Sequence, residues 1–113
     1  MEAKAAAKYI RMSPRKVRQV VDLIRGKSVE TAINILHFTP KRGSVPVEKV
    51  LRSAVANALN KEEGSKLNPD DFYVRSISVD QGPTMRRYRP GPMGRANIIR
   101  KRSCHISVVV SNK

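Results

Sequence analysis

The sequence is poor in the residues on which disulfide-linked and membrane proteins depend. Its 113 residues include a single cysteine and no tryptophan. One cysteine excludes an internal disulfide and fits a reducing cytoplasm. No apolar run approaches the ~18 residues of a membrane-spanning helix, and the start MEAKAAAK does not resemble a secretion signal. We therefore expect a cytoplasmic protein with no membrane partner.

Acidic residues are also scarce. Nine Asp and Glu residues stand against 23 Lys and Arg residues, which gives a formal net charge of +14. Self-repulsion of this size destabilises a compact chain unless an anionic partner offsets it. No carboxylate side chain follows Asp80, so the cations beyond it have few internal partners. The charge distribution favours nucleic acid as the partner.

Catalytic constellations are missing as well. Cys104 and His105 are neighbours on a predicted strand, so their side chains point to opposite faces and cannot share a proton. We interpret Cys104 as a small core residue and His37 as the end of a helix. Acidic residues cluster only in EEGSKLNPDD, a predicted polar surface loop without histidine or a glycine-rich phosphate signature. The sequence predicts no enzyme, no cofactor and no metal site.

Three segments have helical patterns. In SPRKVRQVVDLIRGKS, Ser13 is a predicted cap and Gly26 a predicted stop. The apolar residues between them recur at helical spacing, at Val17, Val20, Val21 and Ile24. A second helix, VETAINILHF, follows the capping Ser28 and ends before the break at Thr39 and Pro40. A third helix is predicted from about Val47 to Asn60, because Pro46 in a helix interior would remove a hydrogen bond.

From Phe72 the spacing of apolar residues changes from the helical period to the two-residue period of strands. FYVRSISVD alternates imperfectly, which indicates a bulge or burial on both sides. The last segment is regular, with one face formed by Cys104, Ile106, Val108 and Val110. The turn between the two strands lies near residues 90–94, which leaves arms of about 40 Å at ~3.3 Å per residue. Since a body of this size has a radius of gyration of only about 12 Å, the tip should project beyond it.

The projecting segment, GPTMRRYRPGPMGRANIIRKR, carries seven Arg or Lys residues and no acid. An isolated two-stranded ribbon is marginally stable in water, so an anionic surround is expected. The planar guanidinium of Arg suits phosphate. Pro90 and Pro92 oppose pairing with a stray strand. Tyr88 either stacks on a base or is a cross-strand partner without a ligand.

The first helix also carries an unusual charge. Its first turns contain Arg15, Lys16 and Arg18, although a helix N-terminus favours anions. A phosphate bound there would resolve the conflict. The alternative is a solvated basic face.

Five segments in order resemble the bacterial form of the L-twenty-two family of large-subunit ribosomal proteins. They are MEAKA, RMSPRKVRQVVDLIRGKS, KVLRSAVANALN, VDQGPTMRR and GRANIIRKRSCHISVVV. The resemblance implies an α+β fold, with three helices packed on a small three-stranded antiparallel sheet and one long protruding β-hairpin. It places the whole chain, 1–113, in a single domain with an extended basic arm at 82–102. It also makes 2–12 the third strand, where propensity alone favours helix.

The resemblance implies a structural protein that binds ribosomal RNA and places its hairpin along the wall of the nascent-chain exit tunnel. Large-subunit RNA, neighbouring ribosomal proteins and the nascent polypeptide are the implied partners, with no homo-oligomer. The RNA-binding residues carried over are Ser13, Arg15, Lys16, Arg18, Lys27, Arg86, Arg87, Arg89, Arg95, Arg100, Lys101, Arg102 and His105. The implied tip at the tunnel wall comprises Tyr88, Pro90, Gly91, Pro92, Met93 and Gly94.

Two departures from the family pattern concern the tip and the last strand. The family often has PRAxGR at the tip, where this chain has PGPMGR, so Gly91 and Pro92 replace an Arg and a small residue. The usual KRTSHI is KRSCHI here, which puts Cys104 where serine is common. The rival hypothesis is an architectural DNA-binding protein that bends duplexes with a proline-tipped basic ribbon.

Overall fold

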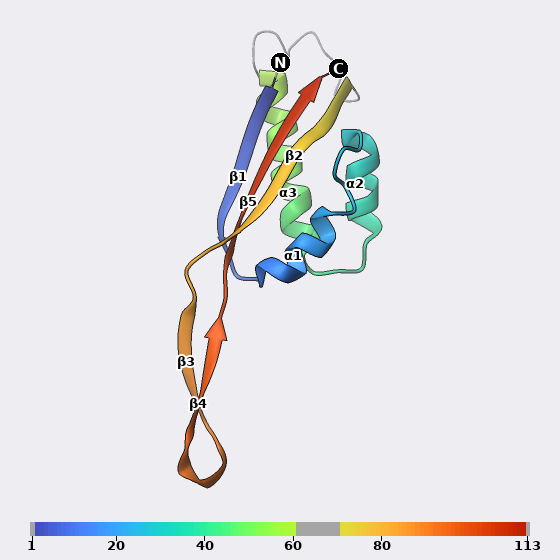
Figure 1. The fold of residues 1–113 in the computed structure, drawn as a ribbon. Coiled ribbons are helices and arrows are strands. Elements are labelled where there is room, and N and C mark those ends of the chain that lie inside the picture. Colours follow the sequence, from blue (N-terminus) through green and yellow to red (C-terminus); the bar gives the residue numbers. More distant parts are fainter. Residues whose placement is uncertain (1, 61–70, 113) are drawn as a thin grey trace.

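A helix-covered sheet forms the body of the molecule, and a narrow two-stranded arm extends from it (Figure 1). The computed structural model describes residues 2–60 and 71–112. In chain order the elements are β1 (Glu2–Ile10), α1 (Pro14–Val21), α2 (Val29–Phe38), α3 (Ser44–Asn60), β2 (Phe72–Gln81), β3 (Met85–Pro90), the short 3-10 helix η3 (Pro92–Gly94), β4 (Ala96–Lys101) and β5 (Cys104–Asn112). The predicted loop EEGSKLNPDD lies outside the described residues except for Asp71.

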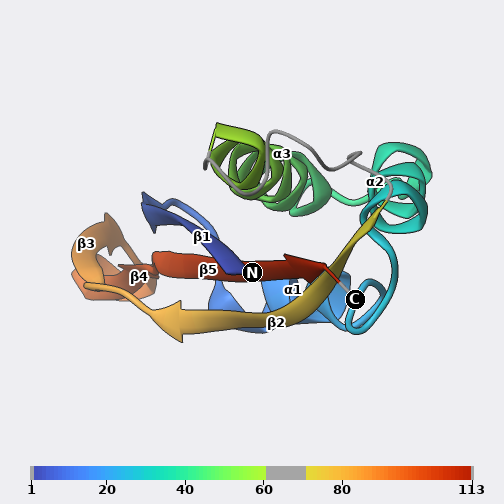
Figure 2. The same cartoon turned by 90° about the horizontal axis from the view of Figure 1, so that it is seen from above.

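The sheet of the body has the order β1-β5-β2, and both pairings are antiparallel. Figure 2 shows α2 and α3 on one side of this sheet. The α+β fold with three helices, three body strands and a long hairpin is as expected. The Ala-rich first segment is a strand and ends at Ile10, two residues earlier than expected. Its pairing with β5 and its contact with α3 override the helical propensity of alanine.

The core lies between the sheet and the helices. Every second residue of β5 from Cys104 to Val110 is fully buried, as the alternating pattern predicted. The four predicted apolar residues of the first helix, Val17, Val20, Val21 and Ile24, are also fully buried. Apolar side chains of β2 complete this layer. The helical and strand periods therefore located the core correctly.

The bulge predicted in the second strand is present. The register of β2 against β5 shifts between Val74 and Ser76, so Arg75 is the extra residue. One extra residue reverses the alternation of a strand. Val74 and Ile77, three positions apart, are consequently both buried.

Helix boundaries differ from the prediction at two places. α1 ends at Val21, and the chain reaches Gly26 through i to i+3 hydrogen bonds from the amides of Leu23 and Ile24. Gly26 has φ +72° and stops the turn, as predicted. α3 begins at Ser44, earlier than predicted, because Pro46 falls in the first turn, where backbone N–H groups have no helical partner.

Both predicted caps occupy the N-cap positions of their helices, and one of them caps through its side chain. The hydroxyl of Ser28 accepts a hydrogen bond from the amide of Thr31 at 3.4 Å. Ser13 is the N-cap residue of α1, as predicted, but its side chain makes no capping hydrogen bond. The second helix ends at Phe38, with Thr39 as the C-cap.

The arm is a separate two-stranded sheet, β3 paired with β4. The expectation of two continuous strands was wrong at the base of the arm. There Gly82, Pro83 and Thr84 are not part of a strand and separate β2 from β3. Pro83 lacks the N–H that a ladder requires. The projection itself is confirmed, because the molecule extends 66 Å along its long axis and only 25 and 15 Å across it. Its radius of gyration of 17.3 Å exceeds the ~13 Å of a compact chain of this length.

Within the described ranges 2–60 and 71–112, no helix is both long and apolar enough to cross a membrane.

Candidate nucleic-acid interface

A large concave surface lies where the arm leaves the body. We call it the junction cleft, and its volume is about 1030 Å³. Its walls come from the end of β1, the start of α1, the segment between α2 and α3, and the base of the arm. It is lined by Tyr9, Arg11, Met12, Ser13, Lys16, Gln19, Lys41, Arg42, Gly43, Pro83, Met85, Arg87, Arg100, Lys101, Arg102 and Ser103. Eight of these side chains are cationic and none is acidic, so the cleft suits a polyanion.

The structure brings six of the predicted RNA-binding residues into this cleft. They are Ser13, Lys16, Arg87, Arg100, Lys101 and Arg102. The first two come from the start of α1 and the others from the arm, so two basic segments far apart in the sequence share one surface. Arg15, Lys27, Arg86, Arg89 and Arg95 are exposed but do not line the cleft.

Three cations of the cleft were missed by sequence reasoning. Arg11 follows β1, and Lys41 and Arg42 lie between α2 and α3. This connection packs on α1: a Cβ at Gly43 would lie 3.4 Å from Cγ2 of Val20, and Nζ of Lys41 donates to Oε1 of Gln19 at 3.4 Å. The signal was available in the sequence as KRG directly before a helix, but only packing places it beside the arm.

The arm exposes its cations on both faces. Cross-strand register pairs Arg86 with Arg100, two like charges directly opposite each other. Such a pair is destabilising in the free protein, so an anion between them is favoured. Tyr88 pairs with Ile98, and these side chains are 70% and 56% exposed. Both of the alternatives for Tyr88 are compatible with this position, because its cross-strand partner leaves most of the ring in solvent.

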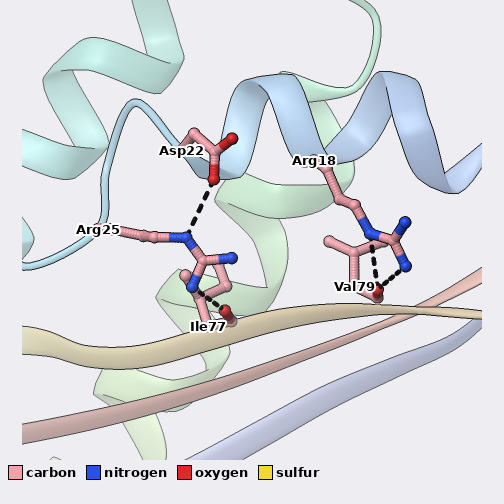
Figure 3. A network of polar contacts seen from close by, with 5 residues as sticks. All are labelled: Arg18, Asp22, Arg25, Ile77 and Val79. Atoms are coloured by element: carbon pink, nitrogen blue, oxygen red, sulfur yellow. Dashed lines mark hydrogen bonds and ion pairs between the residues drawn. The ribbon is translucent and has the colours of Figure 1, made fainter.

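Arg18, a predicted RNA-binding residue, has a role inside the body. Its Nε and Nη2 donate to the carbonyl oxygen of Val79 at 3.2 and 2.9 Å. Seven residues further along the chain, Nη1 of Arg25 donates to the carbonyl oxygen of Ile77 at 2.7 Å, and its Nε donates to Oδ1 of Asp22 at 3.0 Å. Figure 3 shows both guanidinium groups reaching from α1 and its following turn to β2. Because β2 is an edge strand, these bonds cover carbonyls that a stray strand would otherwise pair with.

His105 is likewise engaged within the protein. Its Nδ1 accepts a hydrogen bond from the amide of Tyr9 at 3.0 Å. The neighbouring Ser103 donates its hydroxyl to the carbonyl oxygen of Pro83 at 2.6 Å, and its own carbonyl accepts from the amide of Gly82 at 2.9 Å. A Cβ at Gly82 would lie 2.6 Å from Oγ of Ser103, so a side chain there would displace the hydroxyl that bonds Pro83. These contacts hold the base of the arm against the sheet.

The tip has a conformation of its own. Gly91 donates its amide to the carbonyl of Arg95, and Arg95 donates its amide to the carbonyl of Pro92 at 3.3 Å. A Cβ at Gly91 would lie 2.8 Å from the Arg95 carbonyl oxygen, so the glycine that departs from the family pattern is required by this turn. Met93 has φ +59° and is 98% exposed, which presents a thioether at the far end of the arm.

Catalytic and metal chemistry have little basis in the part of the chain that the structure describes. No group of three His, Cys, Asp or Glu side chains there could hold a metal ion. Cys104 is fully buried, and burial raises the pKa of its thiol, against the smaller opposing effect of the Arg18 charge. A buried, protonated thiol is a poor nucleophile. The interpretation of Cys104 as a core residue is confirmed.

Comparison with known proteins identifies a family. The protein family described as "Ribosomal protein L22p/L17e" matches this chain over residues 5–111. A protein of Pelotomaculum thermopropionicum named "Large ribosomal subunit protein uL22" is 58% identical over 113 residues, which cover 100% of this chain and 97% of the relative. Relatives of the same name from Halothermothrix orenii and Carboxydothermus hydrogenoformans are 56% and 57% identical over the same shares.

Proposed function

The chain belongs to the ribosomal protein L22p/L17e family, and on that premise we propose that its junction cleft and arm bind ribosomal RNA within the large subunit. It is a structural ribosomal protein and not an enzyme. Its compartment is that of the bacterial large subunit, the cytoplasm. Large-subunit RNA and neighbouring ribosomal proteins are its partners.

The observation that carries the RNA-binding proposal is the composition of the junction cleft. Eight cations converge on one concavity from four separate segments, and no carboxylate lies among them. In the free protein these charges repel one another. When phosphate groups bind between them, the repulsion is offset by attraction, and the counterions of the RNA are released. The predicted helix site and the predicted arm site therefore act as one surface.

The arm extends this surface away from the body. None of its β3 and β4 side chains is buried, and only Ile99 is half-buried. We propose that RNA segments pack on both of its faces, with Arg86, Arg89 and Arg95 on phosphates. RNA then supplies the contacts that a core supplies elsewhere, so the whole chain acts as one domain with an arm at 82–102.

The tip is proposed to lie at the wall of the nascent-chain exit tunnel, where the residues from Pro90 to Gly94 face the passage. Its support is the exposed Met93 at the end of the 66 Å long axis. In this arrangement the nascent polypeptide is a transient neighbour, and the protein is a single copy without a homo-oligomeric contact. The relatives reported above are named as large-subunit ribosomal proteins, and none of these names supports the architectural DNA-binding alternative.

Sedimentation of the tagged protein from a native lysate tests the proposal. We expect comigration with large subunits that persists through a high-salt wash, because a threaded arm is held by shape as well as by charge. A matched variant with the arm shortened by deletion of 86–100 should wash off at the same salt concentration. Recovery of the intact chain with chromosomal DNA would contradict the proposal.

A further inference from the structure

Tyr9 has an unusual backbone conformation at the mouth of the junction cleft. Its φ is +60°, in the left-handed region that non-glycine residues rarely adopt. It lies where the register of β1 against β5 shifts between Ala7 and Ile10. The Tyr9 amide lies outside the sheet ladder at this bulge, because it donates to Nδ1 of His105. Conformations of this kind persist only where the surroundings fix them, and they concentrate at functional sites.

His105 fixes this conformation by two contacts. Its Nδ1 accepts the hydrogen bond from the Tyr9 amide at 3.0 Å, so the amide remains satisfied outside the ladder. The two rings meet in a T-shaped contact, with centroids 5.0 Å apart and planes at 87°. The ring of Tyr9 is therefore held in one orientation before any partner binds.

The surroundings of the ring indicate what it receives. Tyr9 is 66% exposed and lines the cleft together with Arg11, Lys16 and Arg42. In a T-shaped contact the imidazole covers at most one face of the phenol, and the 66% exposure of Tyr9 leaves much of the residue open to solvent. An exposed aromatic ring beside cations, in a cavity of about 1030 Å³, fits a planar base joined to phosphates.

We propose that Tyr9 is a stacking platform for the base of an unpaired RNA nucleotide, while Arg11, Lys16 and Arg42 bind the adjoining phosphates. This inference rests on the proposed RNA-binding function and goes beyond it, because phosphate contacts alone do not distinguish duplex from unpaired RNA. Bases in an A-form duplex are stacked on one another, whereas unpaired bases are free to stack on aromatic side chains. Fixing the ring in advance lowers the entropy cost of binding.

Binding of the intact chain to two single-stranded probes tests the platform. One probe is a ten-nucleotide RNA of mixed sequence, and the other is an oligomer of equal length and charge in which tetrahydrofuran spacers replace the nucleosides. Tyr9→Asn removes the ring and suits a left-handed backbone. We expect this variant to bind the RNA about tenfold more weakly and to bind the base-free oligomer as the parent does. Tyr9→Phe should bind both probes as the parent does.

The salt dependence separates stacking from charge. Tyr9→Asn should leave the slope of log affinity against log salt concentration unchanged. Arg42→Gln should weaken the binding of both probes and lower the magnitude of this slope by about one. Tyr9→Leu is a second ring-free variant, and thermal unfolding of each variant establishes that the body remains folded.

Two results would overturn the platform: equal affinity of parent and ring-free variants for the RNA, or an equal loss for both probes. An equal loss for both probes is expected if the ring does not stack on a base and its replacement only disturbs the cationic surface of the cleft. Failure of the proposed function looks different, because the parent itself would then bind neither probe in a salt-dependent manner.

Discussion

The body and the arm of this protein are built on opposite principles. In the body, side chains from β2, β5 and the three helices are removed from water, including the fully buried Ile106 and Val108. In the arm, no side chain of β3 or β4 is buried, and like charges such as Arg86 and Arg100 face each other across the strands. Burial specifies the conformation of the body, whereas the arm has little apolar surface to bury by itself.

This difference shows how one chain serves two purposes. A core gives the body a folded surface on which the backbone places Tyr9, Lys16 and Arg42 around one cleft. The arm gains reach by lacking a core, and its stability depends on what surrounds it. Substitutions in the core of the body should therefore change the free energy of unfolding, and substitutions of the arm's cations should change the affinity for RNA.

The largest expected effect comes from a matched pair of isoleucines. Ile106→Ala in β5 should lower the free energy of unfolding by about 2–5 kcal/mol, because it leaves a cavity in the core. Ile98→Ala in the arm, where the side chain is 56% exposed, should change it by less than about 0.5 kcal/mol. Denaturant unfolding of both variants measures the contrast. Equal losses would show that the arm shares the cooperative core of the body.

The converse effect concerns RNA affinity. Replacing Arg86, Arg87 and Arg95 together with alanine should weaken binding to large-subunit RNA about 100-fold at ~0.15 M salt and lower the salt slope by about three. The free energy of unfolding should stay unchanged. Lys113→Ala, outside the described residues, is the control that alters charge at the end of the chain. Equal RNA affinity of the two variants would refute the role of the arm.

A smaller effect is expected at the boundary between helix and sheet. Arg18→Met removes two hydrogen bonds to the Val79 carbonyl and should lower the free energy of unfolding by about 1 kcal/mol. Arg15→Met, at an exposed position of the same helix, is the matched control and should have almost no effect on stability. Thermal unfolding distinguishes the two, and equal values would show that Arg18 does not hold α1 on β2.

Alkaline pH should destabilise the body through Cys104. Burial raises the pKa of this thiol in the folded chain. Above the ordinary thiol pKa of about 8.5, the unfolded chain loses this proton while the folded chain retains it, so the free energy of unfolding falls as the pH rises. Cys104→Ala should remove this part of the pH dependence. Denaturant unfolding of both proteins at neutral and at alkaline pH measures the difference. Identical pH dependence in both proteins would contradict it.

The smallest expected effect is the protection of the arm's backbone amides against hydrogen exchange in the free protein. In the free protein, amides of residues 84–95 should exchange hydrogen with almost no protection, because opening two exposed strands costs little free energy. Amides of β5 should exchange only on global unfolding. Exchange measured without and then with RNA tests whether the arm becomes ordered on binding. Strong protection of 84–95 without RNA would contradict this expectation.

Much of the fold followed from local patterns. The spacing of Val17, Val20, Val21 and Ile24 predicted the buried side of α1 and of the turn after it, and strict alternation predicted the buried face of β5. The imperfect alternation of FYVRSISVD indicated a bulge or burial on both sides, and the register of β2 shows the bulge at Arg75. These predictions succeeded because periodicity of 3.6 or 2 is a property of neighbouring residues. The strand at the start of the chain required the family resemblance, since alanine propensity favoured helix there.

The sequence by itself determined the large positive charge, the buried faces and the uncovered arm, since composition and local spacing suffice for each. Only the tertiary structure decided that Arg11, Lys41 and Arg42 join the arm in one cleft. It also decided that Arg18 bonds the edge of β2 and that His105 supports Tyr9. Contacts between residues 61 or 96 positions apart depend on packing of the whole chain. Pairing across such distances leaves no periodic pattern among neighbouring residues.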